Sequence, residues 1–315
     1  MSDIPEWVHT LNKPPEYAFD VLKDPASSPE RRLAACQLLM RLGIIRWTME
    51  HLESLRSHPE LTVRVEQLLA IGWELWDTDL TQGNPVPAIP LETCPVGDVW
   101  IVPAGSHRTV LVFPGRYAHM WVSVYLMQRL LEPHGVNVIH VFDALDAFHL
   151  GGIGGMGNSL EAAQHILRRL AANIGTRQLY CFGQSSGGYA ALRYGLDMGA
   201  TAVLAFSPMV FQPRRPRWLA HIHAKTGRRF GPDDIDLRPL YRRYEEEGRS
   251  PPRTTIFCGA NNEADMRSAA ELTDFVGVKH FTLNGISAHD ITPNLLHARL
   301  FHPILTRFFE DPAES

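Results

Sequence analysis

From about residue 96 onwards, short apolar runs alternate with segments of helix length, and this alternation limits the possible folds. The runs span 99–105, 108–115, 136–144, 177–185, 201–211, 253–259 and 278–285. The helix-length segments span 119–133, 159–174, 187–198, 266–276 and 293–309. Strands that are apolar throughout and alternate with helices belong to a parallel sheet covered on both faces. We therefore expect an α/β fold with a mostly parallel sheet.

The N-terminal part of the chain has helical periodicity instead. Apolar residues recur at helical spacing between Pro29 and about Trp76, and Ser28 before Pro29 suits a capped helix start. Residues 78–98 are rich in Pro, Gly, Thr and Asp without a sustained period, which indicates a linker. We expect a helical unit with its linker over 1–95 and a second domain over 96–315.

Composition and charge do not indicate a macromolecular partner. The net charge of −4 gives no global reason to expect nucleic acid or an anionic membrane. No apolar run approaches the roughly 20 residues that cross a bilayer, and the N-terminus lacks a secretory pattern. We predict no membrane span and a cytoplasmic location. Four cysteines, Cys36, Cys94, Cys181 and Cys258, lie apart without a CxxC pair, so we expect buried free thiols.

The most specific motif is GQSSGG, residues 183–188, between an apolar strand-like run and a helical run. A sharp strand-to-helix turn needs small residues two before and two after its apex, where Gly183 and Gly187 stand. Such a turn exposes Ser185 as a nucleophile and aims the backbone N–H of Ser186 at the same space as an oxyanion donor. The alternative is an incidental glycine-rich turn.

A serine hydroxyl needs a base, and histidine titrates near neutral pH. His289 lies in GISAHD, residues 285–290, between the last expected strand and the final helical segment. It can therefore reach the strand edge where Ser185 lies; the alternative is a loop histidine without a role. His221 and His223 lack a third ligand at useful spacing, so we expect no metal there.

The third member of a triad holds the histidine tautomer, and we expect it after the run that ends near Cys258. The acids there are Glu263 and Asp265. We favour Asp265, because a following helix would fix it, although it competes with a role as N-cap of a helix starting at Met266.

The second oxyanion donor is expected in PGRY, residues 114–117, where a glycine precedes Arg116. Tyr117 is the alternative donor, and an ordinary turn is the alternative structure. The segment 152–157 matches the dinucleotide pattern GxGxxG, but the preceding run ends several residues early and no acid follows at the right distance. We interpret it as a loop beside the site and expect no nucleotide cofactor.

These motifs together resemble the α/β-hydrolase superfamily over about Val96 to Phe309. The resemblance rests on the turn at 183–187, the sequence FPG at 113–115, the acidic loop after Cys258, and His289. It implies an eight-stranded, mostly parallel sheet, no cofactor, and an acyl-enzyme on the serine. In many such hydrolases the acid stands three residues after the strand's glycine. That position here is Asn262, which is a departure, and residues 1–95 do not match the common core.

The expected function is a serine hydrolase that cleaves a carboxylic ester or thioester of a small-molecule acyl substrate. An acyltransferase acting on a sugar or other hydroxyl would use the same triad. The departure at Asn262 also leaves room for a catalytically silent module that binds a protein partner. The sequence predicts neither the acyl group nor the oligomeric state.

Residues 212–252 interrupt the alternation without strand character, where the resemblance implies a cap over the site. The segment carries ten Lys or Arg against six Asp or Glu. The basic residues are Arg214, Arg215, Arg217, Lys225, Arg228, Arg229, Arg238, Arg242, Arg243 and Arg249. Clustered arginine suits phosphate or carboxylate, so an anionic substrate is one interpretation and a solvated helical surface is the other.

Overall fold

The computed structural model describes residues 14–79, 99–115, 119–153, 157–210 and 216–310. They form two compact units, each described by itself below. One unit comprises residues 14–79 with Trp121–Leu130 and Thr292–Pro303, and the other comprises the remaining described residues. The boundary expected near residue 95 lies outside the described residues, so the division into 1–95 and 96–315 stays a prediction.

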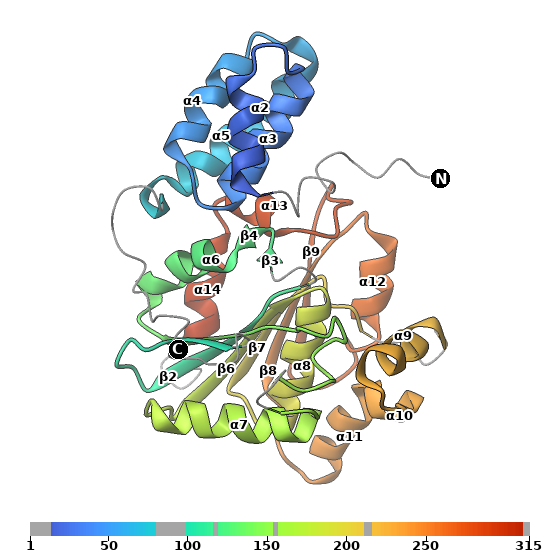
Figure 1. Ribbon diagram of the computed structural model, residues 1–315. Helices are drawn as coiled ribbons and strands as arrows, with labels where there is room; N and C mark the ends of the chain where they lie inside the picture. The colour runs from blue at the N-terminus through green and yellow to red at the C-terminus, as the bar shows by residue number, and fades with distance from the viewer. Residues whose placement is uncertain (1–13, 80–98, 116–118, 154–156, 211–215, 311–315) are drawn as a thin grey trace. The chain divides into compact units, whose positions relative to one another are not determined.

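A mostly parallel sheet forms the centre of the larger unit, as the alternating pattern predicts (Figure 1). Its strands are β1 (Val99–Val102), β2 (Arg108–Phe113), β5 (Asn137–Val141), β6 (Gln178–Gln184), β7 (Ala202–Phe206), β8 (Arg253–Gly259) and β9 (Val278–Leu283). Their order is β1-β5-β2-β6-β7-β8-β9, with β1 antiparallel to β5 and the other neighbours parallel. All seven expected runs are therefore strands, and the described residues do not test the implied eighth.

The chain changes direction across the sheet between β2 and β6. From β2 it moves outwards to β5 and then returns to the other side of β2 to form β6, which leaves β2 and β6 as parallel neighbours. The carboxyl ends of two such strands border the crevice in which open α/β sheets bind ligands. The segments after Phe113 and Gln184 both start at this point, because Phe113 is level with Gly183 in the ladder.

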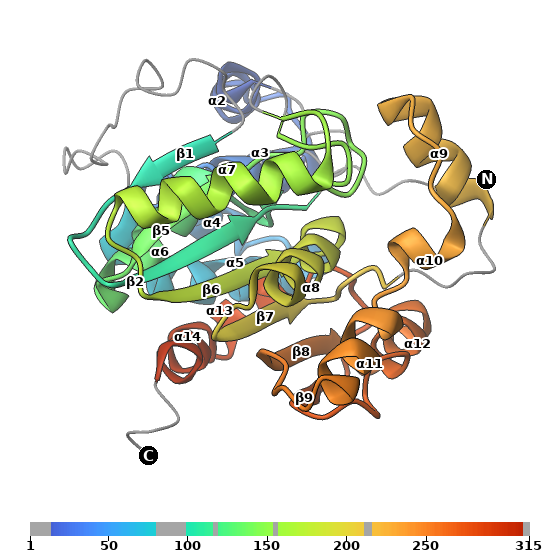
Figure 2. The same cartoon turned by 90° about the horizontal axis from the view of Figure 1, so that it is seen from below.

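Helices α7 (Leu160–Asn173) and α8 (Ser186–Met198) cover one face of the sheet (Figure 2). Their core includes Leu111, Cys181 and Val203 of the strands together with Tyr189 and Tyr194 of α8, all buried. Side chains alternate along a strand, so Tyr180 lies on the other face, where its ring meets those of Phe308 and Phe309. These two residues end α14 (Phe301–Phe309).

The described part of the 212–252 insertion is helical and contains no strand. It forms α9 (Pro216–Thr226), α10 (Pro232–Ile235) and α11 (Arg238–Glu246). Two tyrosine hydroxyls tie this segment to α8: Tyr189 donates to the carbonyl of Ile235, and Tyr244 donates to that of Leu196. The insertion thus packs along α8, while its expected position over the site stays a prediction.

Residues 14–79 of the smaller unit are helical, as their periodicity predicts. They form α2 (Pro15–Lys23), α3 (Pro29–Arg41), α4 (Arg46–Leu55) and α5 (Thr62–Glu74), with the short helices η1 (Pro59–Leu61) and η2 (Trp76–Thr78). The hydroxyl of Ser28 accepts a hydrogen bond from the N–H of Arg31 at 3.2 Å, which confirms the expected cap. Leu33, Leu52 and Val65 are fully buried in the core of this unit.

Three expected helical segments differ from the structure. In place of a helix over 266–276, α12 spans Glu263–Ala270. Residues 119–133 begin with the short strands β3 (His119–Met120) and β4 (Val122–Ser123), and only then form α6 (Val124–Leu131) and η6 (Glu132–His134). Residues 293–309 divide into α13 (Thr292–His297) and α14. Arg299 has a left-handed backbone (φ 56°), which ends the first helix, and Pro303 falls in the first turn of the second, where proline is tolerated.

Cys36, Cys181 and Cys258 are buried free thiols, as expected, and Cys94 lies outside the described residues. Burial raises the pKa of Cys36 and of Cys258 to about 12. No helix among the described residues is long and apolar enough to span a bilayer. The same residues contain no group of three His, Cys, Asp or Glu side chains arranged to hold a metal ion.

Candidate active site

The turn between β6 and α8, residues 183–187, is the elbow that the glycine pattern predicts. A Cβ atom on Gly183 would overlap the carbonyl oxygen of Gly187, and one on Gly187 would overlap that of Phe113. Ser185 at the apex has φ 58° and ψ −120°, a conformation that non-glycine residues rarely adopt. Close packing of backbone against backbone therefore holds Ser185 in a strained position beside the end of β2.

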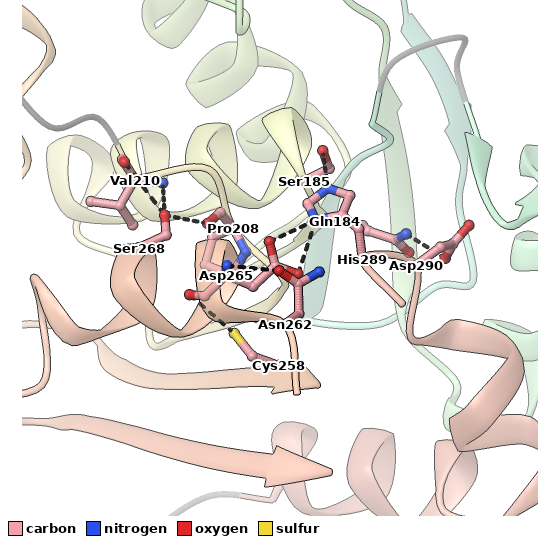
Figure 3. Close-up of polar contacts among 10 residues, drawn as sticks. All are labelled: Gln184, Ser185, Pro208, Val210, Cys258, Asn262, Asp265, Ser268, His289 and Asp290. Carbon is pink, nitrogen blue, oxygen red and sulfur yellow. Dashed lines mark hydrogen bonds and ion pairs between the residues drawn. The ribbon is translucent and has the colours of Figure 1, made fainter. Parts of the chain in front are cut away.

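Two backbone hydrogen bonds fix Ser185 from the side of β7. Its N–H donates to the carbonyl of Phe206 at 2.9 Å, and its carbonyl accepts from the N–H of Met209 at 3.0 Å. The segment after β7 is fixed in turn by Ser268 of α12 (Glu263–Ala270). The Ser268 hydroxyl donates to the carbonyl of Pro208 at 2.8 Å and accepts from the N–H of Val210 at 2.7 Å (Figure 3).

His289 reaches the serine from the loop after β9, residues 284–290, which we name the His289 loop. Its Nε2 lies 2.8 Å from the hydroxyl oxygen of Ser185 (Figure 3). The two residues are 104 positions apart in the chain. They meet because the carboxyl ends of parallel strands lie at one edge of the sheet.

Asp265 lies on the other side of the imidazole. His289 Nδ1 is 2.8 Å from Oδ1 and 3.0 Å from Oδ2 of Asp265, and the carboxylate is buried. Glu263, the alternative acid, has a side chain 86% exposed and lies 3.4 Å from Arg267, so it does not take part in this contact. The structure thus brings Ser185, His289 and Asp265 together in one hydrogen-bonded series.

Asn262, the departure in the sequence, has a clear structural role. Its side chain accepts a hydrogen bond from the N–H of Asp265 at 3.1 Å and so caps α12, which begins at Glu263. The alternative that Asp265 caps a helix starting at Met266 is therefore wrong. Because the cap comes three residues earlier, Asp265 lies within the first turn and its carboxylate is left for His289.

The electrostatic surroundings of His289 favour its protonated form. Burial by itself would lower the pKa of His289, but the hydrogen bond and charge of Asp265, together with the charge of Asp290, raise it above its usual value. This is the environment that stabilises an imidazolium after it accepts a proton. The group can thus act as a base with a buried counter-charge.

Only part of the expected oxyanion site lies within the described residues. Ser186 is the first residue of α8, and the first N–H groups of a helix have no acceptor within it. Arg116 and Tyr117 lie outside the described residues, so the second donor stays a prediction. Phe113 and Pro114 lead into that loop, and their carbonyls pack against Gly187 of the elbow.

The remaining expected features are partly described. His221 Nε2 lies 2.9 Å from the carbonyl of Asp146, and His223 Nδ1 lies 2.9 Å from that of Arg228, so each ring contacts a backbone carbonyl. Of the glycine-rich segment 152–157, residues 154–156 lie outside the described residues. The helix that follows it is capped by Ser159, whose hydroxyl accepts from the N–H of Ala162 at 3.1 Å.

The arginines of the insertion differ in their contacts. Arg238 pairs with Asp236 and Glu271, and Arg249 pairs with Glu247. These arginines therefore have local counter-charges. Arg214 and Arg215 lie outside the described residues, as does the side chain of Arg217, so the expectation of an anionic substrate is untested.

Sequence reasoning missed one partly buried contact at the site. The side-chain amide of Gln184, directly before Ser185, donates to Oδ1 of Asp290, directly after His289 (Figure 3). No motif signals this pair, because its members are 106 residues apart. Two polar residues, each adjacent to a reactive side chain, were the available sign.

Comparisons with known proteins give only distant likenesses. No protein-family model and no curated protein matches the chain. Among solved structures it is similar to the fluorophosphonate-binding serine hydrolase FphF of Staphylococcus aureus, with 13% identity, a TM-score of 0.46, and coverage of 64% of this chain and 84% of that one. It is also similar to the capsule O-acetyltransferase of Neisseria meningitidis serogroup A, with 13% identity, a TM-score of 0.46, and coverage of 66% and 90%.

A third similar structure is described with the carboxylesterases of the Thaumarchaeon Nitrososphaera gargenis, at 13% identity, a TM-score of 0.44, and coverage of 67% and 92%. Identities and TM-scores this low carry no information about activity or residue roles. The chain's own topology is more informative. A serine at a strained turn between a central parallel strand and a helix, followed in the sequence by an acid and a histidine, is the arrangement of one known fold. The chain has the α/β-hydrolase fold.

Proposed function

We propose that the protein is a serine hydrolase that cleaves a carboxylic ester or thioester through an acyl-enzyme on Ser185. The observation that carries the proposal is the continuous series from Asp265 through His289 to Ser185, with 2.8 Å at each step. These distances lie within the range over which a general base takes a proton from a nucleophile. The raised pKa of His289 agrees with this role.

The reaction begins when the Ser185 hydroxyl attacks the acyl carbon and His289 Nε2 accepts its proton. Asp265 keeps the other ring nitrogen protonated and stabilises the imidazolium that forms. The N–H of Ser186 donates to the oxyanion, and a second donor is expected from Arg116. The tetrahedral intermediate then expels the alcohol or thiol, which takes the proton back from His289. Water, deprotonated by His289, releases the acid in the same way.

Labelling with a fluorophosphonate tests the proposal, because this probe phosphonylates activated serines. Wild-type protein is expected to take up one label on the peptide that contains Ser185. Ser185→Ala should take up none, whereas Ser287→Ala is a matched control, because Ser287 is exposed in the His289 loop. A result in which wild-type protein is folded, as judged by circular dichroism, but takes up no label would favour the silent binding module.

The same acyl-enzyme can pass its acyl group to a hydroxyl instead of water. An acyltransferase differs only in holding that acceptor at the step when water would otherwise attack. Product analysis with an activated aryl ester in the presence of sugars and other alcohols distinguishes the two outcomes. Release of free acid alone, at every acceptor concentration, supports the hydrolase.

A further inference from the structure

Two segments meet at the reactive serine through two side-chain contacts that run side by side. One contact joins Ser185 to His289, and the other joins their chain neighbours Gln184 and Asp290 (Figure 3). Gln184 is 4% exposed, so its amide lies in the interior at the end of β6. An amide that donates to a carboxylate makes a charge-assisted hydrogen bond, which is stronger than a neutral one.

The His289 loop is held differently at its two ends. Near its start, the carbonyl of Ile286 accepts from the N–H of Asn261 at 2.9 Å, and Gly259 packs closely against the same carbonyl. Near its end, the contacts of His289 and Asp290 described above are made by side chains. At the end of the loop that carries the imidazole, two side-chain contacts therefore link the loop to Gln184 of β6 and to Ser185 after it.

We propose that Gln184 and Asp290 are a positioning pair that sets the place of His289 relative to Ser185, an inference that rests on the proposed function. The pair acts through two peptide links, one to the nucleophile and one to the base. A displacement of about 1 Å between reacting groups can lower the rate about 100-fold. A contact between the chain neighbours of both groups can therefore change the turnover rate by shifting them slightly.

Asp290 has a second effect, because its charge acts on the imidazole. The charged groups that raise the pKa of His289 are Asp265 of α12 and Asp290 of the loop itself. Neutralising Asp290 should therefore lower the pKa of His289, whereas adding a carboxylate at position 184 should raise it. A residue with a purely structural role would alter stability and leave this pKa unchanged.

The chain contains a matched contact of the same chemistry away from the triad. The amide of Gln164 on α7 donates to Oδ2 of Asp197 at 2.7 Å, near the end of α8 opposite to Ser185. Gln164→Glu adds a carboxylate beside Asp197, as Gln184→Glu does beside Asp290, but Arg193 pairs with Asp197 Oδ2 at 2.6 Å and offsets part of the repulsion. It therefore controls for the Gln-to-Glu change in an amide–carboxylate contact away from the triad.

The test compares wild type, Gln184→Glu, Asp290→Asn, the double variant and Gln164→Glu. We expect Gln184→Glu to lower the rate of fluorophosphonate labelling about 100-fold, since like charges separate the two segments. The double variant exchanges amide and carboxylate and should recover at least about 10-fold of that loss. Gln164→Glu should stay within about twofold of wild type.

A second readout does not depend on reactivity. Histidine NMR titration, with the His289 signal assigned from His289→Gln, should give a lower pKa in Asp290→Asn, a higher one in Gln184→Glu, and a value near wild type in the double variant. If wild-type protein takes up no label, the proposed function fails, and the titration still tests the pair. A labelling rate in the double variant equal to the product of the single effects, together with an unchanged pKa in all variants, would overturn the inference.

Discussion

The hydroxyl oxygen of Ser185 and Nε2 of His289 lie 2.8 Å apart, yet the two residues are positioned by different means. The elbow is fixed by backbone atoms: glycines that admit neighbouring carbonyls, and hydrogen bonds from Ser185 to the end of β7. The His289 loop holds its imidazole through side chains, those of Asp265 and, by our inference, the positioning pair. Backbone packing leaves one conformation available, whereas side-chain contacts can be weakened one at a time. Substitutions in the elbow should therefore mainly lower stability, whereas substitutions of the side chains that hold His289 should mainly lower activity.

The largest effect is expected from removing either reactive group. Ser185→Ala and His289→Ala should each lower kcat by about 10⁶-fold, since loss of either member of such a triad leaves only residual catalysis. Melting temperatures close to that of wild type should accompany this loss, because the elbow does not depend on the serine hydroxyl. Steady-state kinetics on an activated ester measure the effect. Retention of most of the activity in either folded variant would refute the assignment.

Next in size is the loss of the buried carboxylate. Asp265→Asn should lower kcat by about 10⁴-fold, because an amide favours the wrong histidine tautomer. Glu263→Gln is the matched control and should change kcat little, as Glu263 is exposed. Kinetics at saturating substrate compare the two variants. The reverse ranking would assign the role to Glu263.

Glycine substitutions test the backbone side of the comparison. Gly187→Ala should prevent stable folding of the elbow, because its Cβ would overlap the carbonyls of Phe113 and Pro114. Gly285→Ala in the His289 loop has φ 76° but open space around it, so it should cost about 1–2 kcal/mol of stability. Urea unfolding of both variants measures the difference. Equal destabilisation would show that the elbow is not held by close backbone contact.

The pH dependence of turnover tests the side-chain part. His289 must be neutral to accept a proton, and its pKa is raised, so kcat/KM should rise with pH through a value above the usual pKa of about 6.5. Asp265→Asn removes the main group that raises this pKa. Its residual activity should therefore reach its plateau at a lower pH. An acid limb unchanged in this variant would separate Asp265 from His289.

The smallest expected effect concerns the insertion. If the arginines near its start contact an anionic substrate, changing Arg214, Arg215 and Arg217 together to Gln should raise KM for that substrate severalfold and leave a neutral short-chain ester unaffected. The effect should fade as salt rises, since the Debye length is about 8 Å at 0.15 M. Initial rates on a matched pair of esters measure it. Equal kinetics on both, without salt dependence, would leave the arginines as solvated surface.

The sequence predicted the sheet and the elbow because both depend on local patterns. Each strand is a continuous apolar run, and the elbow needs glycines at fixed offsets from its apex. The break in the expected helix 293–309 was not predicted. The left-handed backbone of Arg299 does not change the spacing of the apolar residues, which was the basis of that prediction. In the same way, residues 119–123 have a helical pattern but form two short strands.

The choice between Asp265 and Glu263 depended on where α12 begins, which the sequence left open. Asn262 looked like a lost acid, and its value as a helix cap becomes clear only when its contact with the N–H of Asp265 is known. The contact between Gln184 and Asp290 was not predicted, although each residue is adjacent to a reactive side chain. Contacts between side chains 106 residues apart have no local signature.

The most direct test of the account is the detection of an acyl group on Ser185 during turnover. Protein quenched in acid while it hydrolyses an activated ester should carry one acyl group, and peptide mapping should locate it at Ser185. The adduct should be absent from Ser185→Ala and should form far more slowly in Asp265→Asn. Turnover without any adduct, or an adduct on another residue that Ser185→Ala retains, would contradict the central claim.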